Sequence, residues 1–261
     1  MAEVERQFAR QLAQQGIDIV HALDARWYNA HLEEHGLQPH LKPLPDFGRR
    51  DGALAFLLAN SRALWPCFLD WLKAQPEPEH IADPLDRYTE SVIRGAVAKL
   101  TTTQGDEGSA PAHDIFWSWE KGDRLVSMQR VAVASALCYH DGETQLAIHP
   151  TYGAWVAFRA VVVINARPPS APAPDKLACL LTDKEKAAAR EAMAAALRAS
   201  DEANLCTQLH GAKGMEKDVR LAWAALRDCV GVGKDERYSE EQLEYHYTKD
   251  KAVLLRALTA R

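Results

Sequence analysis

An arginine lies inside an apolar run in the middle of the chain. Residues 145–164 read QLAIHPTYGAWVAFRAVVVI, and an extended strand here would be apolar on both faces except at Arg159. A guanidinium keeps its proton, and burying it without a partner costs free energy. The residues around it are small, namely Gly153, Ala154, Ala157 and Ala160. We therefore expect Arg159 to meet an anion, either a carboxylate of the protein or one carried by a ligand.

Two further arginines accompany aromatic residues. Arg227 follows Trp223 by four positions on a mostly apolar predicted helix, and Arg237 precedes Tyr238 directly before the sequence SEEQ. The guanidinium fork suits carboxylates and phosphates, so a cationic pocket for an anionic ligand is one interpretation. An internal ion pair or a cluster of main-chain carbonyls is the other. Three tryptophans are either flat walls of such a pocket or ordinary core: Trp117, Trp119 and Trp155.

Other catalytic signals are absent from the sequence. It contains no dinucleotide or P-loop glycine motif, no H-E-x-x-H and no G-x-S-x-G. The five cysteines form no C-x-x-C pair, which predicts neither a disulfide framework nor a zinc site. We expect the histidines, among them His35, His40 and His246, to be satisfied or on the surface. No proton-transfer residue and no protein-held metal is therefore predicted.

Composition restricts the class of protein. The chain has 261 residues, of which 47% are hydrophobic and 26% charged, as in soluble globular proteins. A net charge of −5 provides no basic field for nucleic acid or an anionic membrane. No segment approaches the length of a membrane span, and residues 1–15 read as an amphipathic helix rather than a signal peptide. A cytoplasmic location is the expectation.

Hydrophobic periodicity predicts strands in the middle of the chain and helices at both ends. The expected strands are 16–23, 53–60, 114–120 and two within 145–164, separated by a break at His149-Pro150 and Gly153. The expected helices are 2–15, 25–32, 64–75, 84–100, 124–139, 184–200, 218–230, 239–248 and 252–259. Residues 101–113 read as a polar loop and 166–174 as a proline-rich linker. This order indicates an α+β fold.

Four stretches together resemble the cblC-type cobalamin-processing proteins, which are cyanocobalamin reductases and alkylcobalamin dealkylases. They are IHPTYGAWVAFRAVVVI at 148–164, DERYSEEQ at 235–242, RWYN at 26–29 and DPLDRY at 83–88. The resemblance runs from about Gln7 to about Thr259 in the same order. It implies a nitroreductase-like mixed sheet flanked by helices. It also implies a single domain over 1–261, with a sheet-containing core at 1–165 and a helical region at 175–261.

The resemblance implies an activity as well. Such proteins bind cobalamin (vitamin B12) base-off and remove its upper axial ligand. Cyanide leaves by reductive decyanation with FMN or FAD and NADPH, an oxidoreductase reaction, and alkyl groups are transferred to glutathione, a transferase reaction. A cblD-type protein is the implied partner, and the implied state is a monomer or a ligand-induced homodimer. Two alternatives stay open: a non-enzymatic cobalamin chaperone, and a flavin-dependent nitroreductase-like reductase with another substrate.

Site residues follow from the resemblance, position by position. Arg159 and Arg227 would hold the carboxylates of glutathione, and Tyr238 would close the pocket over the upper face of the corrin. The implied corrin contacts are Val126, Ser127, Met128, Gln129, Ala147 and Phe158. Cobalt would be held by the corrin alone, so no ligand from this chain is expected.

The chain departs from the family pattern at three places. Val253 stands where a third glutathione-binding arginine is expected, with Lys251 and Arg256 nearby as substitutes. Val133 stands in place of a histidine, and residues 203–218 read as an insertion with no assigned role. Cobalamin binding and decyanation are therefore better supported by the sequence than dealkylation by glutathione.

Overall fold

The chain divides into two units, each assembled from separate stretches of sequence. The computed structural model describes residues 2–104, 111–202 and 217–259. The first unit, called the sheet unit below, comprises Met1–Ser61, Thr89–Tyr139 and Ala157–Ala178. The second, called the helical unit, comprises Arg62–Tyr88, His140–Val156 and Cys179–Arg261. The expected single domain, with its core at 1–165 and helical region at 175–261, stays a prediction.

A four-stranded sheet forms the centre of the sheet unit. Its order is β1 (Ile19–Asp24), β2 (Leu54–Asn60), β6 (Ala157–Ile164) and β3 (His113–Trp117). The α+β prediction is confirmed. Every pairing among these four strands is antiparallel, whereas the resemblance implied a mixed sheet. The reason is visible in the register of β1 and β2, where Asp24 pairs with Leu54, so that their connection leaves and re-enters the sheet at the same end.

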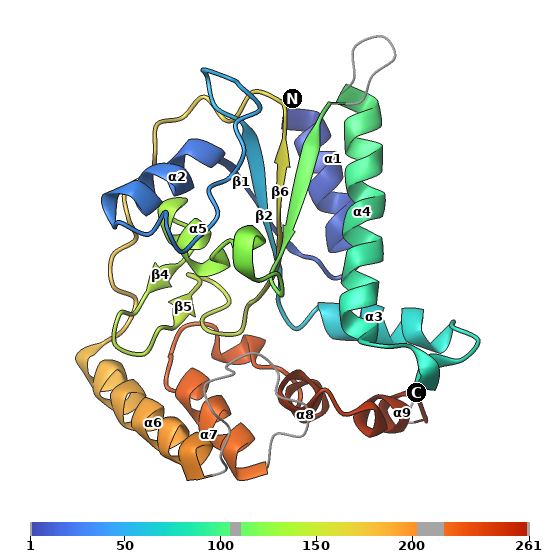
Figure 1. The fold of residues 1–261 in the computed structure, drawn as a ribbon. Coiled ribbons are helices and arrows are strands. Elements are labelled where there is room, and N and C mark those ends of the chain that lie inside the picture. Colours follow the sequence, from blue (N-terminus) through green and yellow to red (C-terminus); the bar gives the residue numbers. More distant parts are fainter. Residues whose placement is uncertain (1, 105–110, 203–216, 260–261) are drawn as a thin grey trace. The chain divides into compact units, whose positions relative to one another are not determined.

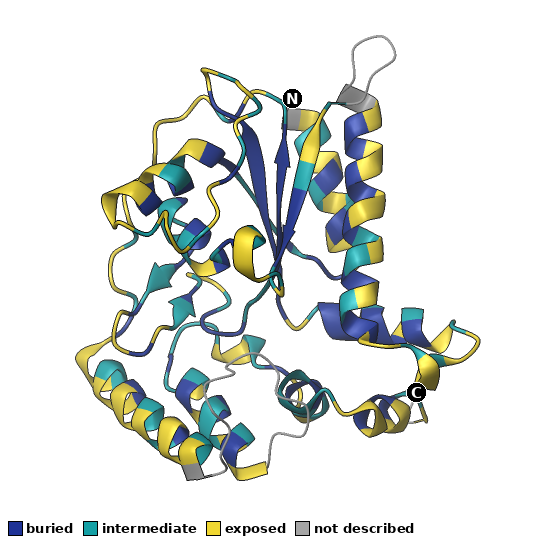
Figure 2. Cartoon of the chain, in the orientation of Figure 1, coloured by how far each residue is buried: buried dark blue, intermediate teal, exposed yellow. Residues whose placement is uncertain are grey.

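Helices cover both faces of this sheet. Figure 1 shows α1 (Ala2–Ala13) and α4 (Pro84–Gln104) on one side and α2 (Ala25–Glu34) and α5 (Met128–Ala134) on the other. All of β2 is buried, as are Arg159 to Ile164 of β6, which Figure 2 shows as dark blue strands. Two covered faces explain why these strands are apolar runs rather than alternating ones.

A β-bulge places Arg159 in the sheet. Ala160 pairs with Leu58 and Phe158 pairs with Ala59, so the register shifts and Arg159 is the extra residue on β6. Bulges bend a strand and redirect a side chain, and they interrupt the regular alternation of faces. The expectation of a regular extended strand with alternating faces, from Trp155 to Val163, is therefore wrong in two respects. Trp155 precedes the strand, which begins at Ala157, and the bulge breaks the pattern at Arg159.

The helical unit consists of helices with one short hairpin. Its helices are α3 (Leu64–Lys73), α6 (Asp183–Glu202), α7 (Lys217–Asp228), α8 (Glu240–Thr248) and α9 (Lys251–Thr259). A two-stranded sheet is formed by β5 (Ala147–Ile148) and β4 (Tyr139–His140), whose first residue, Tyr139, is assigned to the sheet unit. Helix α7 packs on α6 and α8, and α9 packs on α8 and α3. Helix α4 begins in this unit and continues into the sheet unit. Single-turn 3-10 helices lie at Pro78–His80 and Lys234–Glu236 of this unit, and at Gly122–Arg124 of the sheet unit.

Local sequence signals mark the starts of α6, α8 and α4. In the capping box before α6, the Thr182 amide donates to Glu185 at 2.7 Å and the Glu185 amide donates to Thr182 Oγ1 at 3.2 Å. Ser239 Oγ accepts from the amide of Gln242 at 3.2 Å at the start of α8. Helix α4 begins at Pro84 as expected.

Three element ends differ from the prediction. Helix α4 runs on to Gln104, so residues 101–104 of the predicted 101–113 loop are helical, and 105–110 lie outside the described residues. Helix α5 covers only Met128–Ala134, since Ala136 takes a positive φ of 52° that ends the helix. Strand β3 ends at Trp117, before Trp119. No helix in the described ranges is long and apolar enough to cross a membrane.

Candidate functional site

Arg159 is buried in the sheet unit and binds a neutral side chain. It is 8% exposed, and its Nε donates to Oδ1 of Asn60 at 2.6 Å. Asn60 ends β2, is fully buried, and uses its Nδ2 to donate to the carbonyl of Ser61 at 2.7 Å. An amide oxygen satisfies a guanidinium N–H without cancelling its charge. The sequence analysis missed Asn60, although a polar residue at the end of an otherwise apolar strand was the available signal.

Arg227 lies in the last turn of α7 and binds main-chain carbonyls of the helical unit. Its Nε and Nη2 donate to the carbonyl of Ala154 at 2.9 and 2.6 Å, and Nη2 also lies 3.3 Å from the carbonyl of Val156. The guanidinium carbon lies 4.6 Å from the centre of the Trp155 ring and 5.3 Å from that of Tyr238. The carbonyl-cluster interpretation therefore holds for Arg227. Its charge is stabilised by peptide dipoles and aromatic faces.

Trp155 and Tyr238 belong to the core of the helical unit. Trp155 is 1% and Tyr238 2% exposed, their ring centres lie 5.4 Å apart, and both pack with Ala224 and Leu243. Arg237 forms an ion pair with Asp228 at 2.9 Å and with Glu240 at 2.6 Å. Tyr238, expected to cover the upper face of a corrin, thus has its ring inside its own unit, and its predicted role stays untested.

Two glycines fix the backbone that presents the Ala154 carbonyl. Gly153 has a φ of 57° and Gly233 a φ of 70°, both in the left-handed region. A Cβ on Gly153 would overlap the carbonyl of Val232, and a Cβ on Gly233 would overlap the backbone of Tyr152 and Gly153. The two segments approach so closely that only glycine fits at either point. Gly153, where the sequence predicted a break between two strands, lies at this close approach.

The predicted corrin segment at Val126–Gln129 is tied to α2. Val126 and Met128 are buried, and the amide of Ser127 donates to Oη of the buried Tyr28 at 3.2 Å. Burial raises the pKa of Tyr28 to about 12, so its phenol stays protonated at neutral pH. Tyr28 comes from the RWYN stretch, whose contact with Ser127 the sequence analysis did not predict. It holds the start of α5 in a fixed main-chain conformation.

The remaining predicted corrin contacts are divided between the units. Phe158 lies in β6 of the sheet unit and Ala147 in β5 of the helical unit, and both are partly exposed. Partial exposure of an aromatic residue on a central strand leaves part of its ring available to a ligand. Trp119 is 37% exposed and stacks on Trp117 at 5.0 Å, which places two of the three tryptophans considered above side by side.

Val253, which stands where the family pattern has a third arginine, is buried. Val253 in α9 is 1% exposed, so a long cationic side chain is not accommodated there without rearrangement. Both candidate substitutes have partners on the surface of the helical unit. Lys251 donates to the carbonyl of Glu79 at 2.9 Å, and Arg256 pairs with Glu244 at 3.1 Å.

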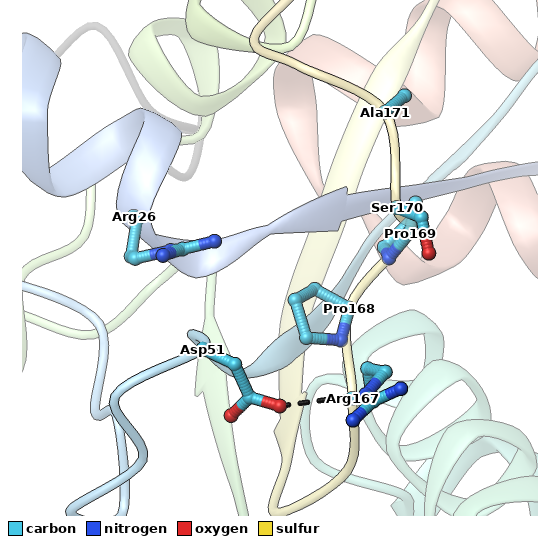
Figure 3. A pocket seen from close by; sticks show the side chains of 7 residues that line it. All are labelled: Arg26, Asp51, Arg167, Pro168, Pro169, Ser170 and Ala171. Atoms are coloured by element: carbon cyan, nitrogen blue, oxygen red, sulfur yellow. Dashed lines mark ion pairs between the residues drawn. The ribbon is translucent and has the colours of Figure 1, made fainter.

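A small open pocket lies on the sheet unit beside the proline-rich linker. Figure 3 shows Arg26, Asp51 and Arg167 around it, with linker residues 168–171 along one side. Its volume is about 240 Å³, below the roughly 300–1,000 Å³ of ordinary small-molecule sites. Both cations are paired, Arg26 with Asp24 at 2.6 Å and Arg167 with Asp51 at 3.4 Å. The pocket is too small for a corrin, and its charges are already compensated.

Comparison with known proteins gives a fold. No protein-family model and no curated protein matches the sequence. The structure matches the crystal structure of a C. elegans B12-trafficking protein, CblC, a human MMACHC homologue, with a TM-score of 0.69. The match covers 98% of this chain and 96% of that chain. The chain has the CblC fold.

Sequence identity with that CblC structure is 17%. Most side chains therefore differ, although the CblC fold extends over nearly the full length of both chains. The expectation of a cblC-type fold is confirmed. The roles of individual residues depend on where this chain places them.

Proposed function

We propose that this protein binds cobalamin base-off and removes its upper axial ligand. The observation that carries the proposal is the CblC fold over 98% of the chain, shared with a protein described as B12-trafficking. The four stretches that resemble the cblC-type family add support from the sequence. Cobalamin is the substrate, and its cobalt supplies the redox and alkyl-transfer chemistry, whereas the chain supplies position and electrostatics.

Main-chain groups would make much of the corrin contact. The segment Val126–Gln129 suits this role because Tyr28 holds the Ser127 amide in place before any ligand arrives. Pre-organisation of this kind reduces the conformational entropy lost on binding. Phe158 and Ala147, both partly exposed, would add apolar contact.

Arg159 is the better candidate for glutathione. Its guanidinium fork suits a carboxylate of the thiol, as the family resemblance implies, and its Nε is held in place by the amide oxygen of Asn60. The carboxylate would also place the thiolate near the alkyl group, with no general base required. Arg227 has two of its nitrogens committed to the carbonyls of Ala154 and Val156, which leaves only part of its fork for a ligand.

The reductive route needs an electron donor. We include FMN or FAD with NADPH in the proposal for decyanation, since the family resemblance implies them. A cytoplasmic location, a cblD-type partner and a monomer or ligand-induced homodimer complete the proposal.

A non-enzymatic cobalamin chaperone is the second candidate function. Two observations favour it: the commitment of Arg227 to main-chain carbonyls, and the buried Val253 at the third arginine position. Both weaken a site for glutathione while leaving cobalamin binding intact. This candidate shares the binding step with the first and lacks the chemistry.

The test is a visible spectrum of the purified protein titrated with methylcobalamin, followed by glutathione, in the dark and without oxygen. A shift to the base-off spectrum and then decay of the alkyl–cobalt band is the expected result. A base-off shift without decay of the alkyl–cobalt band, together with no loss of cyanide when cyanocobalamin is mixed with reduced flavin, would favour the chaperone. No shift at all would overturn cobalamin binding. Arg159→Met should raise the glutathione concentration required at least tenfold, whereas Arg190→Met, an exposed arginine paired with Glu143, should not.

A further inference from the structure

Three metal-binding side chains meet at the end of α2. The sequence HLEEH at residues 31–35 places His31, Glu34 and His35 at spacings of three and four, on one face of the helix. One imidazole nitrogen from each histidine and one carboxylate oxygen of Glu34 all lie within 4.8 Å of one another. The two imidazole rings are adjacent, with centres 4.2 Å apart.

His31 differs from the other two residues because it is buried. It is 7% exposed, and its Nε2 lies away from solvent without a hydrogen-bond partner in the described part of the chain. Buried polar atoms are nearly always satisfied, so an orphaned imidazole nitrogen requires an explanation. A metal ion bound through the lone pair of this nitrogen would provide a partner.

The donor set has a defined chemistry. Two imidazoles and one carboxylate are the ligands of many three-residue zinc sites, which keep a fourth position for water. Glu34 and His35 are exposed, so the side of the cluster that faces solvent is open to an incoming ion. Zinc–nitrogen bonds of about 2.0–2.1 Å require donor atoms closer than 4.8 Å. Glu34 is exposed and can rotate toward an ion, and the Nδ1 of His35 contacts the His31 carbonyl at 2.8 Å, which leaves its Nε2 as the nitrogen for a metal.

We propose that His31, Glu34 and His35 form a binding site for a divalent transition metal ion, with zinc as the occupant. The site lies within the sheet unit, and zinc binding there is independent of the proposed cobalamin function. Arg130 and Lys176 act electrostatically on His31 and oppose a cation, while Glu34 favours it. His31 thus departs from the expectation that the histidines are satisfied.

The experiment measures zinc affinity of the full-length, tag-free protein in competition with a chromophoric chelator. The wild type should bind one zinc ion at this site. His35→Ala should weaken it at least tenfold, and Glu34→Gln by a smaller factor, since a neutral amide is a poorer ligand than a carboxylate. Glu33→Gln, on the same helix but outside the cluster, and His80→Ala, an exposed histidine 3.4 Å from Glu77, are the matched controls and should bind as the wild type does.

A second measurement guards against misfolded variants. Zinc at saturating concentration should raise the Tm of the wild type and of Glu33→Gln, but not that of His35→Ala, because an ion that binds only the folded state stabilises it. Circular dichroism without zinc checks that His35→Ala, a surface change, is folded. Equal zinc affinity in the wild type and His35→Ala, or absence of binding to the wild type, would overturn the proposal.

Discussion

The two arginines that the sequence assigned to one ligand are held in different ways. Arg159 lies in a β-bulge of the sheet unit, 8% exposed, with its Nε on the amide oxygen of Asn60. Arg227 lies at the end of a helix in the helical unit, with two nitrogens on the Ala154 carbonyl and aromatic rings on its faces. Residue type alone predicted the same environment for both.

This difference separates a structural cation from one suited to a ligand. Carbonyl dipoles and ring faces stabilise Arg227 from several sides and connect α7 to the segment Ala154–Val156. Arg159, in contrast, binds the amide oxygen of Asn60 through its Nε and is the arginine proposed above to bind a carboxylate of glutathione. We therefore expect substitutions around Arg227 to affect stability most, and those around Arg159 to affect stability less and ligand binding more.

Gly153→Ala should have the largest effect. The new Cβ would overlap the Val232 carbonyl, and the φ of 57° is unfavourable for alanine. We expect a loss of about 3 kcal/mol or more in the free energy of unfolding. Urea unfolding would measure it, with Gly142→Ala as the control, because a Cβ there meets no atom within 4 Å. Equal midpoints for the two variants would contradict the close contact.

Arg227→Ala should come next, with a loss of about 2–3 kcal/mol. It removes the donors to two carbonyls and the cation on the Trp155 ring. Arg190→Ala, which removes an exposed ion pair with Glu143, should change stability by less than about 1 kcal/mol. If urea unfolding gave Arg227→Ala the stability of Arg190→Ala, the structural role of Arg227 would be refuted.

Asn60→Ala tests the other arginine and should cost about 1–2 kcal/mol, since the Nε of Arg159 loses this acceptor. Asn60→Asp keeps an oxygen against Arg159 and adds a negative charge, but it replaces the Nδ2 donor to the Ser61 carbonyl by an oxygen. We expect a loss of stability similar to that of Asn60→Ala, and any anion bound at Arg159 should be weakened by at least tenfold. Chemical unfolding and glutathione-dependent decay of methylcobalamin give the two readouts. Unchanged glutathione dependence in Asn60→Asp would show that Arg159 does not bind glutathione.

The smallest effect concerns pH and lies in the sheet unit. Burial lowers the pKa of His21, outweighing the opposite effect of its 3.0 Å contact with the Ser135 carbonyl. The unfolded chain therefore takes up the proton first as the pH falls below about 6.5. The contribution of neutral His21 to the free energy of unfolding is complete above that pH and decreases below it. His21→Gln should flatten this slope in unfolding curves at pH 7 and pH 5, whereas exposed His40→Gln should leave it unchanged.

Local signals predicted the elements well. Capping residues and periodicity located the starts of α4, α6 and α8, since these depend on neighbours within four positions. The end of α5 was missed because a left-handed Ala136 stops it, and alanine carries no turn signal. The expected order of strands and helices correctly led to an α+β fold.

Contacts distant in sequence were harder to predict. Asn60 meets Arg159 from 99 positions away and Tyr28 meets Ser127 from 99 positions away, and neither pairing leaves a trace in local pattern. The bulge at Arg159 depends on the register of two strands, which composition does not encode. His31 was not singled out because its burial arises from packing, not from residue type.

The carboxylate of the capping box at α6 has a second structural role. Besides accepting from Thr182, Glu185 accepts from the amide of Gly231 at 2.7 Å through its other oxygen. One carboxylate thus joins the beginning of α6 to the residues that follow α7, while the two helices pack along their length. Loss of this one carboxylate would therefore remove both its part of the cap of α6 and the link to Gly231, so a single substitution at Glu185 has two structural consequences.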